Sequence, residues 1–124
     1  MVNNIKKLGT AAVLLASLFV TQQALAHAYL KDAVPADKSE VATSPKQLTL
    51  KFTGDVEASF SGIELKDAKG DVIPTGKATL DSTDKSSLIV PLDKELDAGQ
   101  YNVDWRVLSV DGHKSEGQYS FSVK

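Results

Sequence analysis

The fold is decided by the stretch YNVDWRV, residues 101–107, in which apolar and polar side chains alternate strictly. An alternation with a period of two is typical of a β-strand that buries one of its faces. Trp105 is the one tryptophan of the chain and stands in the middle of this stretch. We therefore expect a long strand here, with Trp105 at the centre of the hydrophobic core.

Shorter runs of the same kind lie on both sides of this strand. Apolar residues alternate with polar ones in 48–52, 63–65, 88–92 and 119–123, and weaker strands are expected at 28–34 and 77–80. Clusters of turn-forming residues separate the runs, and no part of the chain after residue 26 has a sustained helical period. Six or seven short strands at this spacing predict a single all-β domain, either an antiparallel sandwich or a Greek-key barrel.

The first 26 residues have the layout of a secretory signal. Lys6 and Lys7 precede 13 mostly apolar residues, 8–20, and a short polar stretch leads to a small-residue site that ends at Ala26. The apolar run is too short for a membrane-spanning helix, which needs about 20 residues. We predict a cleaved signal at 1–26 and a mature domain at 27–124. A second small-residue site at 26–28 would make Tyr29 the first residue, but the polar spacer favours the cut after Ala26.

Charge and composition exclude several functions. The full chain has 14 basic and 16 acidic residues, and loss of Lys6 and Lys7 leaves 12 basic ones, which changes the formal charge from −2 to −4. A mildly acidic domain does not suit nucleic acid but attracts cations. The absence of cysteine excludes disulfides, thiolate catalysis and thiolate metal sites. The one methionine is Met1, so the mature domain has no sulfur ligand.

Both histidines of the mature chain stand where they could bind a metal ion. After cleavage at Ala26, His27 would carry a free α-amine, and this nitrogen and the ring Nδ1 could chelate one ion. In Asp111-Gly112-His113, a carboxylate and an imidazole two positions apart can point the same way. Three nitrogens and one oxygen in a plane suit Cu(II), although zinc also accepts such ligands. Taken alone, the tripeptide is more typical of a hairpin turn than of a metal site, and the two histidines become informative only together.

Several segments resemble the CopC family of periplasmic copper-binding proteins, including its YobA-type members. They are residues 27–30 with 35–36, then 48–52, 60–62, 88–92 and, most specifically, 101–114. The resemblance covers essentially the whole mature chain. It implies a seven-stranded antiparallel Greek-key β-barrel or sandwich with an immunoglobulin-like appearance.

The resemblance also implies a function. It assigns one Cu(II) ion per chain to the N-terminal amine and imidazole of His27, to Asp111 and to His113. It implies a periplasmic role in copper homeostasis and resistance, in some relatives beside a CopD-type inner-membrane copper transport protein, and we expect a monomer. Some relatives have a methionine-rich Cu(I) site, which this chain cannot form, so we expect a Cu(II)-only member. Relatives often carry a glutamate shortly after the strand at 48–52; here the residues are Gly54 and Asp55, and Asp55 is not assigned as a ligand.

Two other hypotheses belong to different classes of protein. A histidine-brace-like site is also found in copper enzymes that oxidise polysaccharides, but such catalysis needs an open coordination position and a substrate surface. An aspartate in the metal plane and a domain of about 98 residues argue against it, so we expect no enzymatic activity. A metal-free structural domain would predict that copper affinity is unchanged when Asp111 and His113 are replaced together.

Overall fold

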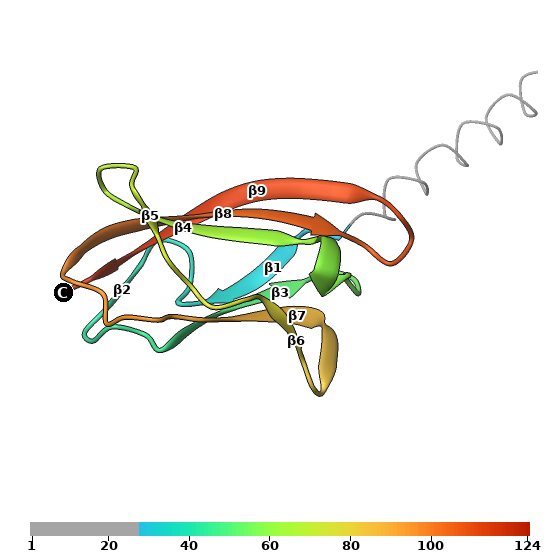
Figure 1. The fold of residues 1–124 in the computed structure, drawn as a ribbon, viewed down its shortest axis with the longest axis horizontal. Helices are drawn as coiled ribbons and strands as arrows, with labels where there is room; N and C mark the ends of the chain where they lie inside the picture. Colours follow the sequence, from blue (N-terminus) through green and yellow to red (C-terminus); the bar gives the residue numbers. More distant parts are fainter. Residues whose placement is uncertain (1–27) are drawn as a thin grey trace, which may run out of the picture.

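The computed structural model describes residues 28–124, which form nine β-strands and one short 3-10 helix (Figure 1). The elements are β1 (Leu30–Val34), β2 (Ser39–Val41), β3 (Gln47–Phe52), η3 (Ala58–Phe60), β4 (Gly62–Asp67), β5 (Val72–Ile73), β6 (Thr79–Asp81), β7 (Asp84–Pro91), β8 (Gly99–Leu108) and β9 (Lys114–Val123). Within this range no helix has the length and apolar character needed to cross a membrane.

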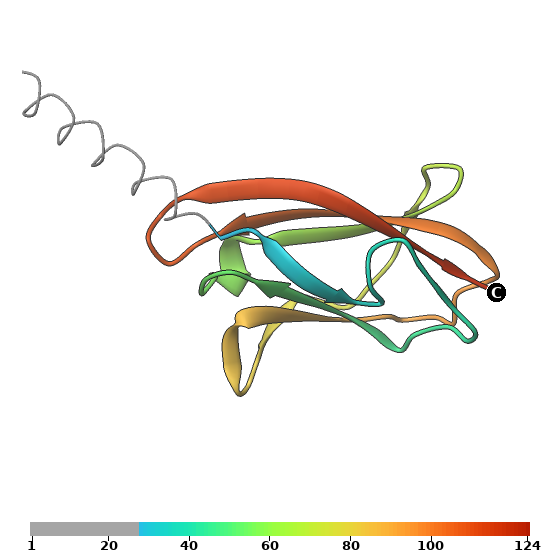
Figure 2. The ribbon, with the colours of Figure 1, turned by 180° about the vertical axis from the view of Figure 1, so that it is seen from behind.

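The strands form two sheets that pack face to face (Figures 1 and 2). One sheet has the order β1-β3-β7-β6 and the other the order β2-β9-β8-β4-β5. All pairs are antiparallel except β2 with β9, which run parallel. The predicted all-β sandwich is therefore confirmed. All seven expected strands are present, and β2 and β5 are additional ones.

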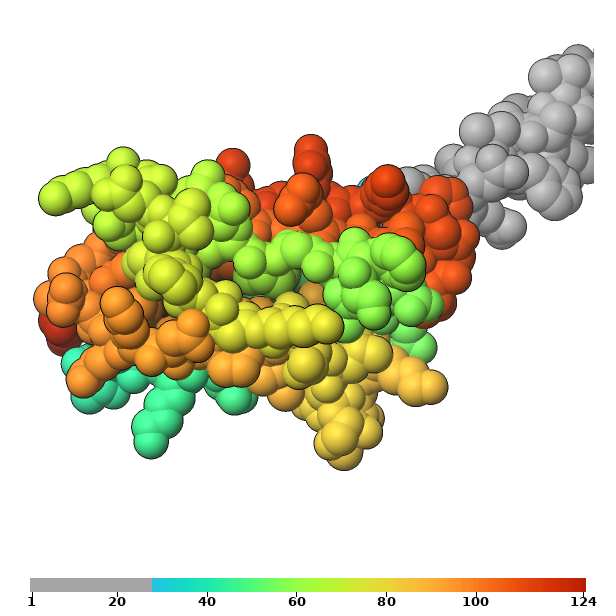
Figure 3. All heavy atoms as spheres, viewed as in Figure 1, coloured from blue at the N-terminus to red at the C-terminus, as the bar shows by residue number. Residues whose placement is uncertain are grey.

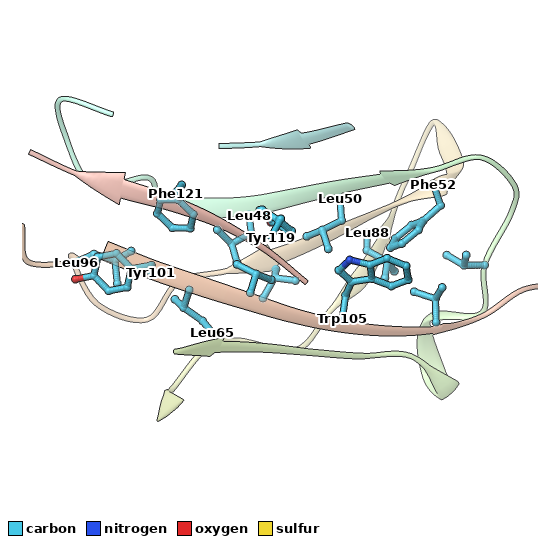
Figure 4. Packing of buried hydrophobic residues seen from close by; sticks show 14 of the residues in the cluster. Leu48, Leu50, Phe52, Leu65, Leu88, Leu96, Tyr101, Trp105, Tyr119 and Phe121 are labelled. Atoms are coloured by element: carbon cyan, nitrogen blue, oxygen red, sulfur yellow. The ribbon is translucent and has the colours of Figure 1, made fainter. Parts of the chain in front are cut away.

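The core lies between the two sheets, and its residues follow the alternation. In β8, every second side chain from Tyr101 to Val107 is buried, and the residues between them are exposed or half-buried. Trp105 is 6% exposed, and its ring lies edge-on to that of Phe52 in the opposite sheet, with 5.3 Å between the centroids (Figure 4). The predicted burial of Trp105 in the hydrophobic core is confirmed.

Gly117 gives the Trp105 side chain its space. It is the direct partner of Trp105 in the β8–β9 register, and a Cβ at Gly117 would lie 2.6 Å from Cζ2 of the indole ring. Atoms that are not bonded do not approach so closely, since carbon atoms pack best at about 3.5–4.0 Å. Any other residue at this position must therefore displace the largest side chain of the core.

One end of the sandwich brings distant parts of the chain together. It carries the loop between β8 and β9, the helix η3, and the start of β1, which lies beside that loop in Figure 2. A hydrogen bond from Glu57 N to Leu108 O joins the segment before η3 to the end of β8. The Asp111-Gly112-His113 segment lies in this loop, so this end of the sandwich is where the candidate site is found.

Candidate metal centre

Residues 109–113 connect β8 to β9, and three of them, 110–112, form a tight hairpin loop. Ser109 N donates to His113 O at 2.8 Å, and Gly112 N donates back to Ser109 O at 2.9 Å. Gly112 has a φ of +92°, a left-handed conformation that glycine adopts without steric cost. A three-residue hairpin loop with glycine in this conformation is a common connection between antiparallel strands. The turn indicated by the Asp-Gly pair is therefore present.

The loop places the side chains of Asp111 and His113 against each other. Asp111 Oδ1 lies 3.1 Å from His113 Nδ1, and it also accepts hydrogen bonds from the Ser109 hydroxyl and from His113 N. These bonds, that of Ser109 foremost, lower the pKa of Asp111 to about 2, so the group is an anionic carboxylate at neutral pH. The structure brings together two of the three residues predicted to bind metal.

This pair is suited to a divalent cation but does not make a complete site. The 3.1 Å between Asp111 Oδ1 and His113 Nδ1 is short enough for both atoms to contact one ion, because nitrogen and oxygen ligands lie about 2.0–2.2 Å from a metal such as zinc. The side chains of Asp111 and His113 are 39% and 52% exposed, so an ion can reach them from solvent. Within residues 28–124, no group of three His, Cys, Asp or Glu side chains is arranged to hold a metal ion. A third histidine, cysteine or acidic ligand for an ion bound by this pair would have to come from outside that range.

The third predicted residue, His27, lies outside the described residues, but its neighbour in the chain is well placed. Ala28 is 1% exposed, and its carbonyl accepts a 2.6 Å hydrogen bond from the Ser115 hydroxyl. Ser115 lies in β9, two positions after His113. The start of the described chain is thus fixed beside the strand that follows the candidate ligand.

A second pair of hydrogen bonds strengthens this attachment. Tyr29 N donates to the Thr53 hydroxyl at 3.0 Å, and Thr53 N donates to Tyr29 O at 2.8 Å. No sequence pattern singles out Ser115 or Thr53, because a hydroxyl residue at the surface of a strand or turn is ordinary. Their role follows only from the pairing of segments that are 87 and 24 residues apart.

Asp55 contacts the loop through its backbone. Its carbonyl accepts a 3.1 Å hydrogen bond from Val110 N, and the next residue, Val56, forms an isolated bridge with Ser109. The Asp55 side chain is exposed and does not join Asp111 and His113 in a metal-binding group of the described chain. The segment therefore supports the loop from one side.

The family of the chain is decided by a match that spans all but the first two of the described residues. The CopC domain family matches residues 30–124. The chain belongs to the CopC family. The resemblance seen in the sequence is thereby confirmed.

Individual relatives agree with this assignment. Protein YobA from Escherichia coli K12 is 41% identical over 124 residues, which cover 100% of both chains. The crystal structure of CopC from Methylosinus trichosporium OB3b is 40% identical and matches with a TM-score of 0.74 over 79% of this chain and 94% of that one. PcoC from Escherichia coli, a methionine-rich copper resistance protein, is 35% identical, with a TM-score of 0.72 over 80% of this chain and 100% of PcoC.

Proposed function

We propose that the mature protein is a periplasmic protein that binds Cu(II) and sequesters or delivers it in copper homeostasis and resistance. Membership of the CopC family supports a role with copper, because the similar protein PcoC is a copper resistance protein. The observation that carries the proposal is the Asp111–His113 pair, held at 3.1 Å on the β8–β9 loop beside the anchored start of the domain.

The proposed ligands are the α-amine and imidazole of His27, the carboxylate of Asp111 and the imidazole of His113, with one Cu(II) per chain. Consecutive Cα atoms are about 3.8 Å apart, so a residue bonded to Ala28 starts close to the strand that follows His113. Three nitrogens and one oxygen form a donor set that suits Cu(II). Cu(I) prefers sulfur, and this chain has no cysteine and no methionine besides Met1, in contrast to methionine-rich PcoC.

The burial of Ala28 supports cleavage after Ala26, with a signal at 1–26 and a mature domain at 27–124. A cut after Ala28 would remove a residue that is 1% exposed and would leave the Ser115 hydroxyl without its 2.6 Å acceptor. Burial of a small apolar side chain and one hydrogen bond each stabilise a fold by about 1 kcal/mol. The domain is therefore more stable with Ala28 attached.

The position of the site suits exchange of the ion with other molecules. The half-exposed side chains of Asp111 and His113 lie at the rim of the sandwich, outside the apolar core. A partner can reach an ion there without opening the fold. A CopD-type inner-membrane copper transport protein is the partner we propose, and the protein would act as a monomer.

Native mass spectrometry of the exported protein with one equivalent of Cu(II) tests the ligand set. We expect a chain that begins at His27 and retains one copper ion. The double variant Asp111→Ala/His113→Ala should keep the same N-terminus and lose the ion. A wild-type chain that begins at Tyr29, or one that retains no copper, would contradict the proposal.

A further inference from the structure

A groove of about 660 Å³ lies on the outer face of the larger sheet, next to the candidate metal centre. It runs between η3 with the start of β4 on one side and β8 and β9 on the other, where the green and orange-red atoms meet in Figure 3. Lys114 and Ser115, the two residues after His113, belong to its lining. The groove therefore borders the loop that carries Asp111 and His113.

Arg106 lines the groove and its side chain lies against β4. In the sheet register it stands between Gly62 on β4 and Glu116 on β9. Its guanidinium leans over Gly62, where a Cβ would lie 2.9 Å from Nη2. No ion pair joins it to Glu116 or to any other carboxylate in residues 28–124. The absence of a side chain at Gly62 thus leaves room for the guanidinium, which forms no ion pair within 4.0 Å in the described residues.

The rest of the lining adds to the positive charge. Lys114 is a second cation without an ion pair inside the described domain, whereas Glu116 is the one acid in the lining. The hydroxyl of Ser59 offers a further donor, and Phe60, which is 72% exposed, forms an apolar wall. The mature chain has more acidic than basic residues, but this lining has two basic residues and one acidic residue, and its net positive charge attracts anions.

We propose that the groove binds the carboxylates of a small di- or tricarboxylate, the kind of ligand that forms anionic chelates with Cu(II). The planar guanidinium of Arg106 matches a carboxylate through two parallel hydrogen bonds, and Lys114 attracts a second carboxylate as a point charge. The link to copper rests on the proposed function. A chelate held here lies beside the Asp111–His113 pair, so the groove would capture the chelate before its ion moves to the protein ligands.

The binding itself can be tested without copper, by following backbone amide NMR signals of the mature protein during titration with citrate. We expect saturable shifts at Ser59, Gly62, Arg106 and Lys114. Loss of one exposed ion pair between protein and ligand weakens binding by about fivefold, so Arg106→Gln should weaken citrate binding by roughly that factor or more. Arg106→Lys should give an intermediate affinity, because it keeps the charge and loses the paired hydrogen bonds.

Lys69→Gln is the matched control. Lys69 lies in the turn between β4 and β5, at the far end of β4 from Gly62, and the substitution removes the same charge. It should leave citrate binding unchanged. A fivefold loss of citrate affinity in this variant would mean that the net charge of the protein, and not the groove, determines binding. The absence of saturable shifts in the groove, or equal binding of citrate by wild type and Arg106→Gln, would overturn the proposal.

Two further probes identify the ligand. Sulfate should bind more weakly than citrate, and equal binding would contradict a carboxylate site. A triglutamate peptide that binds more tightly than citrate would assign the groove to a protein partner and overturn the small-molecule proposal. Native mass spectrometry of Arg106→Gln with aqueous Cu(II) should still detect one copper ion, so that failure of the groove and failure of the copper site give different results.

Discussion

The Gly117→Ala substitution tests the packing of Trp105 in the core. The new methyl group would lie 2.6 Å from Cζ2 and 2.9 Å from Cε2 of the Trp105 indole. The ring must move by about 1 Å to restore ordinary contact distances of about 3.5–4.0 Å. It cannot move freely, because Phe52 packs against it from the opposite sheet at a centroid distance of 5.3 Å.

The expected loss of stability follows from two opposing effects. Insertion of a methyl group into a packed core costs about 1–3 kcal/mol. Replacement of glycine by alanine in a strand returns about 0.5–1 kcal/mol, since the unfolded chain loses entropy. We expect a net loss of about 1–2 kcal/mol, which in a domain of about 100 residues lowers the Tm by roughly 5–15 °C.

Thermal unfolding of the mature protein, followed by near-UV circular dichroism, measures this effect. The matched control is Gly54→Ala, because Gly54 has no positive φ and a Cβ there would meet no atom within 4 Å. Gly54→Ala should melt at the wild-type temperature or slightly above it. If Gly117→Ala behaves like Gly54→Ala, the packing of Trp105 against β9 described above is wrong.

Three further predictions concern the copper site, two buried tyrosines and one carboxylate. Cu(II) at 100 times its Kd should stabilise the native state by about 2.7 kcal/mol and raise the Tm by roughly 10 °C or more, and His113→Ala should abolish this rise. Ser115→Ala removes one hydrogen bond that anchors the chain beside the site, so it should weaken Cu(II) binding in competition titrations by roughly fivefold. The Tyr119 hydroxyl is buried and has no hydrogen-bond partner among residues 28–124, so Tyr119→Phe should be at least as stable as wild type in urea unfolding. Tyr101→Phe loses a 2.6 Å hydrogen bond to a main-chain carbonyl and should lower the free energy of unfolding by about 1 kcal/mol. Asp84 accepts hydrogen bonds from one lysine and two serines, and these bonds, that of the lysine foremost, lower the pKa of Asp84. The resulting stabilisation of the fold is present above the unfolded-state pKa of about 4 and is lost as the pH falls. Asp84→Asn should therefore be less stable than wild type at pH 7 and should lose less stability between pH 5 and pH 2. Equal acid sensitivity of the two proteins would contradict the last prediction.

Features that depend on residues close together in the sequence could be predicted from it. The alternation in 101–107 predicts β8 and the burial of Trp105, because the period of a strand is a local property. The strands β2 and β5 were not predicted, since runs of three and two residues are too short to have a period. The parallel pairing of β2 with β9 joins the two ends of the domain, which no local pattern can indicate.

For Asp111-Gly112-His113, the turn hypothesis and the ligand hypothesis do not exclude each other. The positive φ of Gly112 closes the hairpin, and the same closure places His113 Nδ1 3.1 Å from the Asp111 carboxylate. The contacts that complete this end of the molecule were not predictable. The Ser115–Ala28 hydrogen bond and the contact of the Arg106 side chain with Gly62 depend on how segments that are far apart in the sequence pair with each other.

The proposed ligand set makes copper binding depend on export. In the uncleaved precursor, the nitrogen of His27 belongs to a peptide bond, which does not offer the lone pair of an amine. Signal cleavage would create that amine, and the Ser115–Ala28 hydrogen bond would hold the new terminus beside the Asp111–His113 pair. A chain that keeps residues 1–26 has only two imidazoles and one carboxylate from this set and should bind Cu(II) more weakly. A copper competition titration that compares the precursor with the mature protein measures the difference, and equal affinities would remove the amine from the ligand set.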